Sequence, residues 1–264
     1  MLKIGVFDSG LGGLTVVKSL SQVIKNAELF YIADTKNAPY GEKTPKQILQ
    51  YSLDITKYLL VKHDIDVLIL ACNTATAFAI KQLRELYPHL IIIGTEPGVK
   101  PAIEQTQTGK IGILATPATL KGEKYQELVN ILAQEKDVQL FEQSCSGLVE
   151  QIEKGEISTE KTRKLLENWV LPMKENSVDT IVLGCTHYPL VADIISEIMT
   201  SDVLLIDTGM AIANRLLDLS FKQGHINKGT LSMTLSTTGD IQNLLVEQIL
   251  QLPISIDTIN ISNI

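Results

Sequence analysis

The stretch DVLILACNTATAFAI (66–80) runs from an uninterrupted apolar segment into a cysteine and then into a pattern with helical spacing. A second stretch, DTIVLGCTHYPL (179–190), repeats this order around Cys185. Apolar runs that do not alternate with polar residues are typical of strands buried on both faces, as in parallel sheets covered by helices. The two stretches therefore favour an α/β fold in which two strands end in a cysteine.

The rest of the chain follows the same alternation of short apolar runs and amphipathic patterns. The other predicted strands are KIGVFD (3–8), LFYIAD (29–34), LIIIGT (90–95), KIGILAT (110–116) and DVLLID (202–207). Between the strands, the clearest helical patterns cover residues 14–24, 45–63, 74–87, 121–134 and 190–199. Strands that alternate with helices predict mainly parallel sheets flanked by helices.

An internal repeat divides the predicted fold into two lobes. The segment that begins at Ile4 resembles the one that begins at Ile111, and Cys72 and Cys185 are separated by a similar offset. We therefore expect two similar α/β lobes, related by a pseudo-twofold axis, with the active site in the cleft between them. The first lobe would comprise residues 1–93 plus about 208–264, the second 94–207. The C-terminal part, with its TTGD turn (237–240), would return to the first lobe.

Composition and charge narrow the classes of partner. The 264 residues carry a net charge of −7 and no block of consecutive basic residues, so we expect no nucleic acid. No apolar run approaches the roughly 20 residues that span a bilayer, and the N-terminus lacks a signal-peptide pattern. Three cysteines are an odd number, which favours free thiols. We expect a cytoplasmic protein that does not bind membranes and acts on a small molecule.

The setting of the two cysteines suggests proton transfer. Each stands where a strand ends and a helix is expected to begin, and N–H groups at a helix N-terminus stabilise a thiolate. A single buried cysteine is more often a small hydrophobic side chain, but two cysteines in matching hydroxyl-rich turns favour function. Two thiols on opposite sides of a carbon could remove a proton from one face and return one to the other, as a racemase without a cofactor must do.

Other polar residues near these turns have open roles. His187, two residues after Cys185, could bond the thiol or polarise a substrate group. Asp8 ends an apolar strand, where it could cap the helix that starts near Gly13, accept an ammonium group or relay a proton. Cys145 lacks a comparable setting, and we expect it to be structural.

The glycine-rich DSGLGG loop (8–13) does not have the spacing of a nucleotide-binding fingerprint. The pattern G-x-G-x-x-G would require a glycine at position 15, where the chain has a threonine. A short loop of this kind favours an anion the size of a carboxylate. No His, Cys, Asp or Glu residues have the spacing of a metal site, so we expect neither a metal nor an organic cofactor.

Six motifs spread over nearly the whole chain carry a family resemblance. They are GVFDSGLGGLTV (5–16), YIADTKNAPYGEKT (31–44), ACNTATA (71–77), ILATPAT (113–119), GCTHYPL (184–190) and IDTGMAIA (206–213). On these motifs the chain resembles the glutamate racemase family. The resemblance implies a cofactor-independent isomerase that supplies D-glutamate for peptidoglycan synthesis, and homodimers are common in the family.

The resemblance also implies residue roles. Cys72 would deprotonate D-glutamate and Cys185 L-glutamate, with His187 assisting Cys185 and Asp8 in the catalytic machinery. The residues implied to hold the substrate are Asp8, Ser9, Pro39, Tyr40, Gly41, Asn73, Thr74, Thr116, Thr119, Thr186 and His187.

A supporting carboxylate is assigned through the segment CSGLVEQIE (145–153). The family pattern C-P-x-[FL]-V-P-x-[IV]-E, counted from Cys145, ends on Glu153, but both prolines are missing and the nearer Glu150 stays an alternative. Alternatives for the whole chain are an aspartate racemase, a glutamate-binding protein without catalysis, and a thiol redox protein. The redox alternative is disfavoured because the chain has no C-x-x-C motif.

Overall fold

The computed structural model describes residues 1–135, 138–200, 202–253 and 255–261. Two compact units are present: one contains Met1–Thr95 and the described part of Thr208–Ile264, and the other contains Glu96–Asp207. The prediction of an α/β fold with parallel sheets flanked by helices is confirmed, because every strand pairing in both units is parallel.

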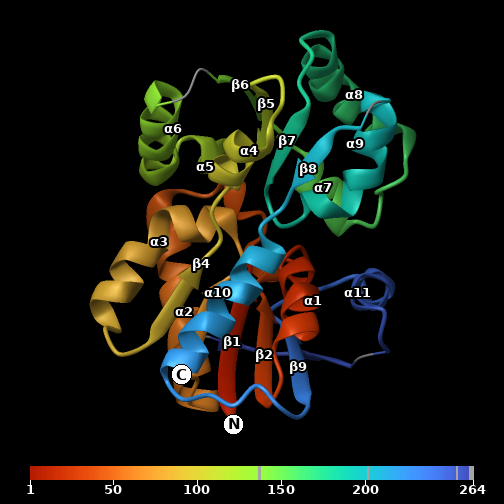
Figure 1. The fold of residues 1–264 in the computed structure, drawn as a ribbon. Helices are drawn as coiled ribbons and strands as arrows, with labels where there is room; N and C mark the ends of the chain where they lie inside the picture. Colours follow the sequence, from red (N-terminus) through yellow and green to blue (C-terminus); the bar gives the residue numbers. More distant parts are fainter. Residues whose placement is uncertain (136–137, 201, 254, 262–264) are drawn as a thin grey trace. The chain divides into compact units, whose positions relative to one another are not determined.

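The first unit is built on a six-stranded sheet in the order β10-β9-β2-β1-β3-β4. Helices α2 and α3 cover one face, and α10 and α11, which both contact α1, lie with it on the other face (Figure 1). The elements are β1 (Leu2–Asp8), α1 (Leu14–Val23), β2 (Ala27–Ala33), α2 (Pro45–His63), β3 (Val67–Leu70), α3 (Asn73–Leu86), β4 (Ile91–Gly94), α10 (Gly209–Lys222), β9 (Leu231–Thr237), α11 (Asn243–Leu250) and β10 (Ile256–Thr258).

The second unit is built on a four-stranded sheet in the order β6-β5-β7-β8. Helices α4 and α6 pack on one face through the cluster around Ile111 and Val182, and α8 reaches the sheet through Met173, next to Gly112. The elements are α4 (Val99–Gln105), β5 (Lys110–Ala115), α5 (Pro117–Leu120), α6 (Glu123–Glu135), β6 (Gln139–Ser144), α7 (Leu148–Glu153), α8 (Glu160–Glu175), β7 (Thr180–Gly184), a 3₁₀ helix (Tyr188–Val191), α9 (Ala192–Met199) and β8 (Leu204–Ile206).

The strand orders of the two units correspond. In the first unit the order β2-β1-β3-β4 places the second strand, then the first, third and fourth, and β6-β5-β7-β8 does the same in the second unit. The sequence repeat is therefore a repeat of sheet topology, with β1 equivalent to β5 and β3 equivalent to β7. The chain returns to the first unit after β8, where β9 pairs with β2 over seven residues and extends that sheet.

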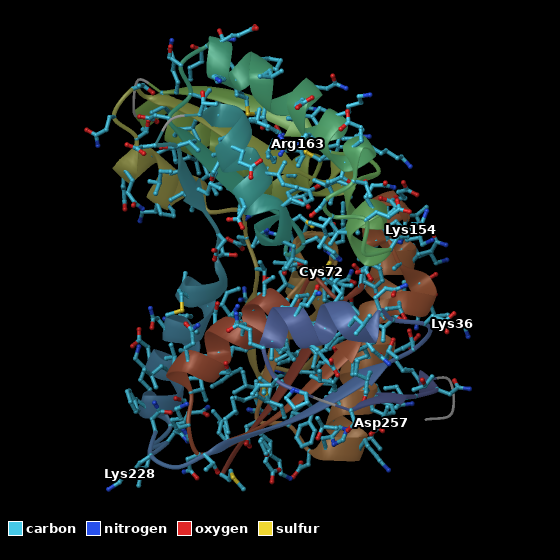
Figure 2. The ribbon with its side chains drawn as sticks, turned by 90° about the vertical axis from the view of Figure 1, so that its right-hand side faces the viewer. Lys36, Cys72, Lys154, Arg163, Lys228 and Asp257 are labelled. Carbon is cyan, nitrogen blue, oxygen red and sulfur yellow. The ribbon has the colours of Figure 1, made fainter. Side chains whose placement is uncertain are left out.

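Burial explains why the strands carry no polar alternation. Residues Val67–Leu70 of β3 and Thr180–Gly184 of β7 are buried at every position, because helices cover both faces of each sheet. In contrast, the charged side chains of Lys36, Lys228 and Asp257 lie on the outside of the first unit, whereas Cys72 is buried (Figure 2).

Candidate active site

Each unit carries one cysteine at the switch point of its sheet. The chain passes from β1 to a neighbour on one side and returns to β3 on the other side, and β5 and β7 have the same relation. Ligands of open α/β sheets bind beyond the carboxyl ends of the strands at such a point. Cys72 follows β3 and Cys185 follows β7, so both thiols stand where the fold favours a ligand.

The first thiol site consists of Asp8, Ser9 and Cys72. Cys72 is the N-cap of α3, and its Sγ accepts a hydrogen bond from the backbone N–H of Ala75 at 3.5 Å. The Oγ atom of Ser9 lies 3.9 Å from the same sulfur. Because α3 is a helix of 14 residues, its N-terminal amides and dipole stabilise negative charge on this sulfur.

The carboxylate of Asp8 is fully buried and bonded within the glycine-rich loop. Its Oδ1 accepts from the backbone N–H of Ser9 at 2.6 Å and lies 3.3 Å from Ser9 Oγ, and its Oδ2 accepts from the N–H of Gly13 at 2.5 Å. Gly13 is the N-cap of α1, so Asp8 performs the capping role considered for it. The backbone N–H groups of Ser9 and Gly13 are therefore bonded to a carboxylate of the chain itself.

Asn73 and Thr74 open α3 directly after Cys72 and are both buried. Within the described part of the chain, Nδ2 of Asn73 has no hydrogen-bond partner. A buried amide without a partner costs roughly 1–3 kcal/mol. An unpaired Asn73 amide at the switch point is therefore explained if its Nδ2 donates a hydrogen bond to a ligand.

The PYG loop (Pro39, Tyr40 and Gly41) follows β2 in the first unit. A 3₁₀ turn (Thr35–Asn37) and a cis Ala38–Pro39 peptide bond precede a second 3₁₀ turn (Tyr40–Glu42). The ring of Tyr40 is buried in the core, and its hydroxyl donates to Oδ2 of Asp34 at 2.6 Å. Burial, together with the Asp34 carboxylate, raises the pKa of Tyr40 well above 10, so this hydroxyl stays a protonated donor.

The second thiol site consists of Cys185, His187 and Glu153. Sγ of Cys185 lies 3.6 Å from Nδ1 of His187, and Nε2 of His187 lies 2.5 Å from Oε1 of Glu153. The ring therefore links the thiol to a carboxylate. Glu153, one of the two glutamates left open by the sequence, contacts His187 directly.

The imidazole of His187 is set up to carry a positive charge. Burial by itself lowers the pKa of His187, but the bonds to Cys185 and to Glu153 outweigh it, and the pKa lies well above 6.5. The charged form of the ring therefore has a sulfur on one side and a carboxylate on the other as hydrogen-bond partners. The helix expected after Cys185 begins as a 3₁₀ helix (Tyr188–Val191) with Pro189 in its first turn, and the α-helix that follows, α9, begins only at Ala192.

Three threonines surround the second switch point. Thr116 follows β5 and caps α5, with its Oγ1 accepting from the backbone N–H of Thr119 at 3.2 Å. The hydroxyls of these two residues are bonded to each other at 2.9 Å. Thr186, next to Cys185, is also buried. All three lie at the carboxyl end of neighbouring strands, since β5 pairs with β7.

Cys145 has a different environment from the other two cysteines. It follows β6, its Sγ lies 3.5 Å from the carbonyl oxygen of Gln143, and burial raises its pKa far above the ordinary thiol value. A thiol that stays protonated is neither a base nor a nucleophile. The structure therefore agrees with the structural role expected for Cys145.

The described ranges offer neither a cluster suited to a metal ion nor a helix suited to a membrane. No group of three or more His, Cys, Asp or Glu side chains in them is arranged to hold a metal ion. None of the helices described is both long and apolar enough to cross a membrane.

Comparison with known proteins places the chain in a family. The model of the family described as Asp/Glu/Hydantoin racemase matches residues 4–216. The chain belongs to this racemase family. A protein of Sulfurovum sp. (strain NBC37-1) named glutamate racemase is 64% identical over 249 residues, which cover 94% of each chain.

Solved structures of glutamate racemases have a similar fold over 98–100% of this racemase. A glutamate racemase isoform of Bacillus anthracis is 28% identical with a TM-score of 0.87, covering 98% of this chain and 97% of that one. The glutamate racemase of Francisella tularensis in complex with D-glutamate is 27% identical with a TM-score of 0.83, covering 100% and 99%.

Two residues of the racemase that sequence reasoning did not select bond to the candidate site. Asp34, at the end of β2, accepts from Tyr40, and Thr238, after β9, donates to Asp34. Asp34 lies in the motif YIADTKNAPYGEKT (31–44), and Thr238 lies in the TTGD turn (237–240). A buried aspartate at a strand end was a usable signal for Asp34, but the pairing of β9 with β2 could not be predicted.

Proposed function

We propose that this racemase interconverts L- and D-glutamate by proton transfer between the α-carbon and two thiols, Cys72 and Cys185. The observation that carries the proposal is the placement of one partnered thiol at the switch point of each of two units with the same topology. Relatives named glutamate racemase, at up to 64% identity, support glutamate as the substrate.

In the L to D direction, the thiolate of Cys185 takes the α-proton and the C–H electron pair stays on the α-carbon. The resulting carbanion delocalises into the α-carboxylate. Cys72 then gives its thiol proton to the opposite face, which forms D-glutamate and leaves Cys72 as the thiolate. The reverse reaction, or proton exchange with water, restores the starting protonation state. This proposal requires both thiol sites to meet one substrate molecule.

The polar groups around the thiols have roles that follow from this charge movement. Negative charge that develops on the carboxylate is stabilised by fixed hydrogen-bond donors, and the buried Nδ2 of Asn73 is such a donor. Asp8 sets the geometry of its loop and is proposed to accept the substrate ammonium group or to assist Cys72. His187, supported by Glu153, assists Cys185. The remaining residues proposed to hold the substrate are Ser9, Pro39, Tyr40, Gly41, Thr74, Thr116, Thr119 and Thr186.

The cellular setting follows from the proposed reaction. An enzyme that makes D-glutamate supplies a component of peptidoglycan, so it would act in the cytoplasm, where wall precursors are assembled. We also propose a homodimer and no nucleic-acid partner, in line with the net charge of −7. Sedimentation of the purified protein measures the oligomeric state.

The direct test is proton NMR of the purified, reduced protein with L-glutamate in D₂O, together with a chiral assay for D-glutamate and a control with L-aspartate. We expect the α-proton signal of glutamate to disappear while D-glutamate accumulates. Exchange of the α-proton of aspartate without exchange of that of glutamate would show that glutamate is not the substrate. Binding of glutamate with no α-proton exchange would overturn the racemase activity.

A further inference from the structure

Asp34 lies at the centre of a buried network in the first unit. The residue is 1% exposed. Oδ2 accepts from the Tyr40 hydroxyl at 2.6 Å, Oδ1 accepts from the Thr238 hydroxyl at 2.7 Å, and Nδ2 of Asn37 donates to both oxygens at 3.0 and 3.1 Å. A carboxylate that is buried and fully bonded holds its partners firmly, because each of these bonds is charge-assisted.

The network joins two segments that are about 200 residues apart in the chain. Tyr40 belongs to the PYG loop, and Thr238 belongs to the TTGD turn that follows β9. The backbone joins the same points, since the N–H of Thr238 donates to the carbonyl of Ala33 at 3.0 Å and the N–H of Asp34 donates to the carbonyl of Asp8 at 2.9 Å. Asp34 therefore connects the ends of β1, β2 and β9 to the PYG loop.

Gly239 shows that the TTGD turn is fitted closely to the turn before the PYG loop. A Cβ at this position would lie 3.1 Å from the backbone nitrogen of Lys36 and 3.1 Å from Oγ1 of Thr35. The backbone N–H of Lys36 also donates to the hydroxyl of Thr238 at 3.1 Å. The turn thus supports the PYG loop both by hydrogen bonds and by close backbone contact.

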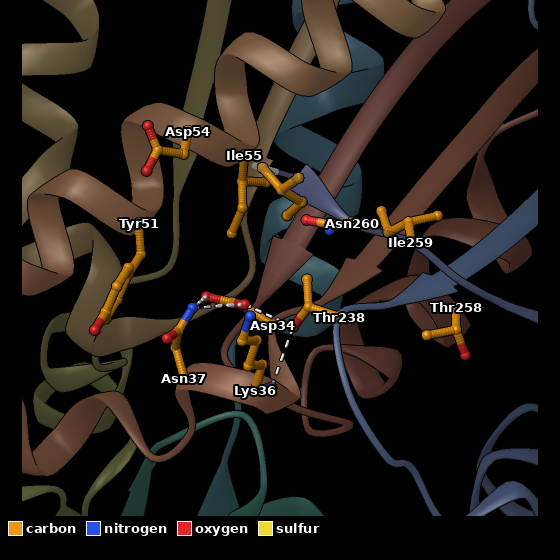
Figure 3. Close-up of a pocket in the computed structure, with 11 residues that line it drawn as sticks. Asp34, Lys36, Asn37, Tyr51, Asp54, Ile55, Thr238, Thr258, Ile259 and Asn260 are labelled. Carbon is orange, nitrogen blue, oxygen red and sulfur yellow. Dashed lines mark hydrogen bonds between the residues drawn. The ribbon is translucent and has the colours of Figure 1, made fainter. Parts of the chain in front are cut away.

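The same network forms part of the wall of a cavity of about 650 Å³ in the first unit. Figure 3 shows Asn37 and Thr238 each bonded to Asp34 on one side, with Tyr51 and Asp54 of α2 on another. Asp54 is exposed, and its carboxylate accepts from Gln50. The cavity therefore offers matched control positions, because Asp54 and Thr258 line it away from the bonds of Asp34.

We propose that Asp34 and Thr238 are positioning residues that set the PYG loop for substrate binding, so that the returning C-terminal segment completes the first half of the active site. This inference rests on the proposed function, in which Tyr40 and Gly41 hold the substrate. Tyr40 cannot both donate its hydroxyl proton to Asp34 and point that proton at a substrate. Its contribution to binding is therefore the position of the loop.

The test compares Thr238→Val, which removes the hydroxyl at similar volume, with Thr238→Ser, which keeps it. We expect Thr238→Val to raise KM for glutamate in both directions about tenfold, with kcat within about twofold, since losing the loop's position weakens ground-state and transition-state binding alike. Thr238→Ser should restore KM. Tyr40→Phe should raise KM similarly, and the double variant with Thr238→Val should show less than the product of the two effects, because both act through Asp34.

Asp54→Asn and Thr258→Val serve as controls and should leave KM unchanged. A Kd for D-glutamate, measured by calorimetry, gives a readout that does not depend on turnover. Asp34→Asn tests the same network from its centre, provided that its thermal unfolding shows that the variant is folded. An unchanged KM and Kd in Thr238→Val, alongside racemisation by the wild type, would overturn the positioning role and leave the proposed function standing. A wild type that binds D-glutamate without racemising it would overturn the function, while the Kd values would still decide the role of Thr238.

Discussion

The two thiol sites occupy equivalent places in the two units and handle charge in different ways. Cys72 is the N-cap of a long α-helix and contacts the hydroxyl of Ser9. Cys185 is followed by a 3₁₀ helix and contacts His187, which is bonded to Glu153. The sulfur of Cys72 is supported by the amides of α3 and by the Ser9 hydroxyl, which does not titrate near neutral pH. The sulfur of Cys185 is supported by the His187 imidazole and, behind it, by the Glu153 carboxylate.

The local sequence explains this difference. Cys72 is followed by NTATA, in which the asparagine suits the start of a helix and the two alanines favour its continuation, and α3 begins at once at Asn73. Cys185 is followed by THYP, and α9 is delayed to Ala192. The delay leaves His187 in a turn from which its ring reaches Cys185. A repeat of topology therefore fixes where the thiols stand, and the residues after each strand decide how each thiol is supported.

The asymmetry cannot be read from racemisation rates alone. L- and D-glutamate have equal free energies, so kcat/KM must be the same in both directions for any variant. The difference between the sites must instead be measured one thiol at a time. Exchange of the α-proton with D₂O, in variants that keep a single thiol, provides this measurement.

The largest expected effect comes from removing either thiol. Cys72→Ala and Cys185→Ala should each lower racemisation by about 10³-fold or more, because general bases typically contribute about 10²- to 10⁴-fold and the reaction needs two. Cys72→Ala should still exchange the α-proton of L-glutamate in D₂O, and Cys185→Ala that of D-glutamate. Substantial racemisation by either variant would contradict the use of two thiols, and exchange of the other enantiomer would reverse the assignment of faces.

The next effect separates the supports of the two thiols. In the Cys72→Ala background, His187→Asn should slow exchange of L-glutamate by about 10²-fold, because the ring that supports the Cys185 thiolate is lost. In the Cys185→Ala background, Ser9→Ala should slow exchange of D-glutamate by about tenfold at most, because the amides of α3 remain. NMR of both enantiomers measures these rates. Equal effects of the two changes would show that the supports do not differ in strength.

A smaller effect concerns folding stability and its pH dependence. Glu153→Gln should lower the free energy of unfolding by roughly 1 kcal/mol near pH 6, because the amide oxygen can still accept from the charged ring of His187 but the opposite charge that strengthens this bond is lost. The pKa of His187 in the folded protein is raised above that of the unfolded chain. Its stabilisation is therefore complete below about pH 6.5 and is lost as the pH rises through the folded pKa.

Urea unfolding at several pH values checks this prediction, with Glu150→Gln as the matched control. The difference between wild type and Glu153→Gln should narrow as the pH rises, and Glu150→Gln should show a smaller and flatter difference. A difference for Glu153→Gln that widened with pH would show that the His187 ring is neutral in the folded protein.

The sequence predicts the fold well because its strongest pattern has a single physical cause. Continuous apolar strands such as VLIL in β3 require helices on both faces, and the repeat indicates two similar units. It misses β6, because Gln139–Ser144 lies at the edge of its sheet, is only partly buried and therefore has no continuous apolar run. The 3₁₀ helix after Cys185 is also missed, since the run of apolar residues from Leu190 looks the same for either helix type.

For the site, motifs identify the residues around the thiols, but the contacts between them depend on tertiary structure. Family spacing selects Glu153, and only the structure shows that it reaches His187. Asp34 and Thr238 have no local signal that joins them, because their contact depends on the pairing of β9 with β2.

The smallest effect is expected at the third cysteine, which tests whether a strand end alone makes a thiol functional. Cys145 follows the carboxyl end of β6, as Cys185 follows that of β7. It has no imidazole partner among the described contacts, and burial raises its pKa. Cys145→Ala should therefore keep kcat and KM within about twofold and cost roughly 1 kcal/mol of stability. In the wild type, iodoacetamide should modify Cys72 and Cys185 well before Cys145, as mass spectrometry of digests can show. Loss of activity in Cys145→Ala, or labelling of Cys145 at the rate of the other two, would mean that position at a strand end matters more than the groups that surround the sulfur.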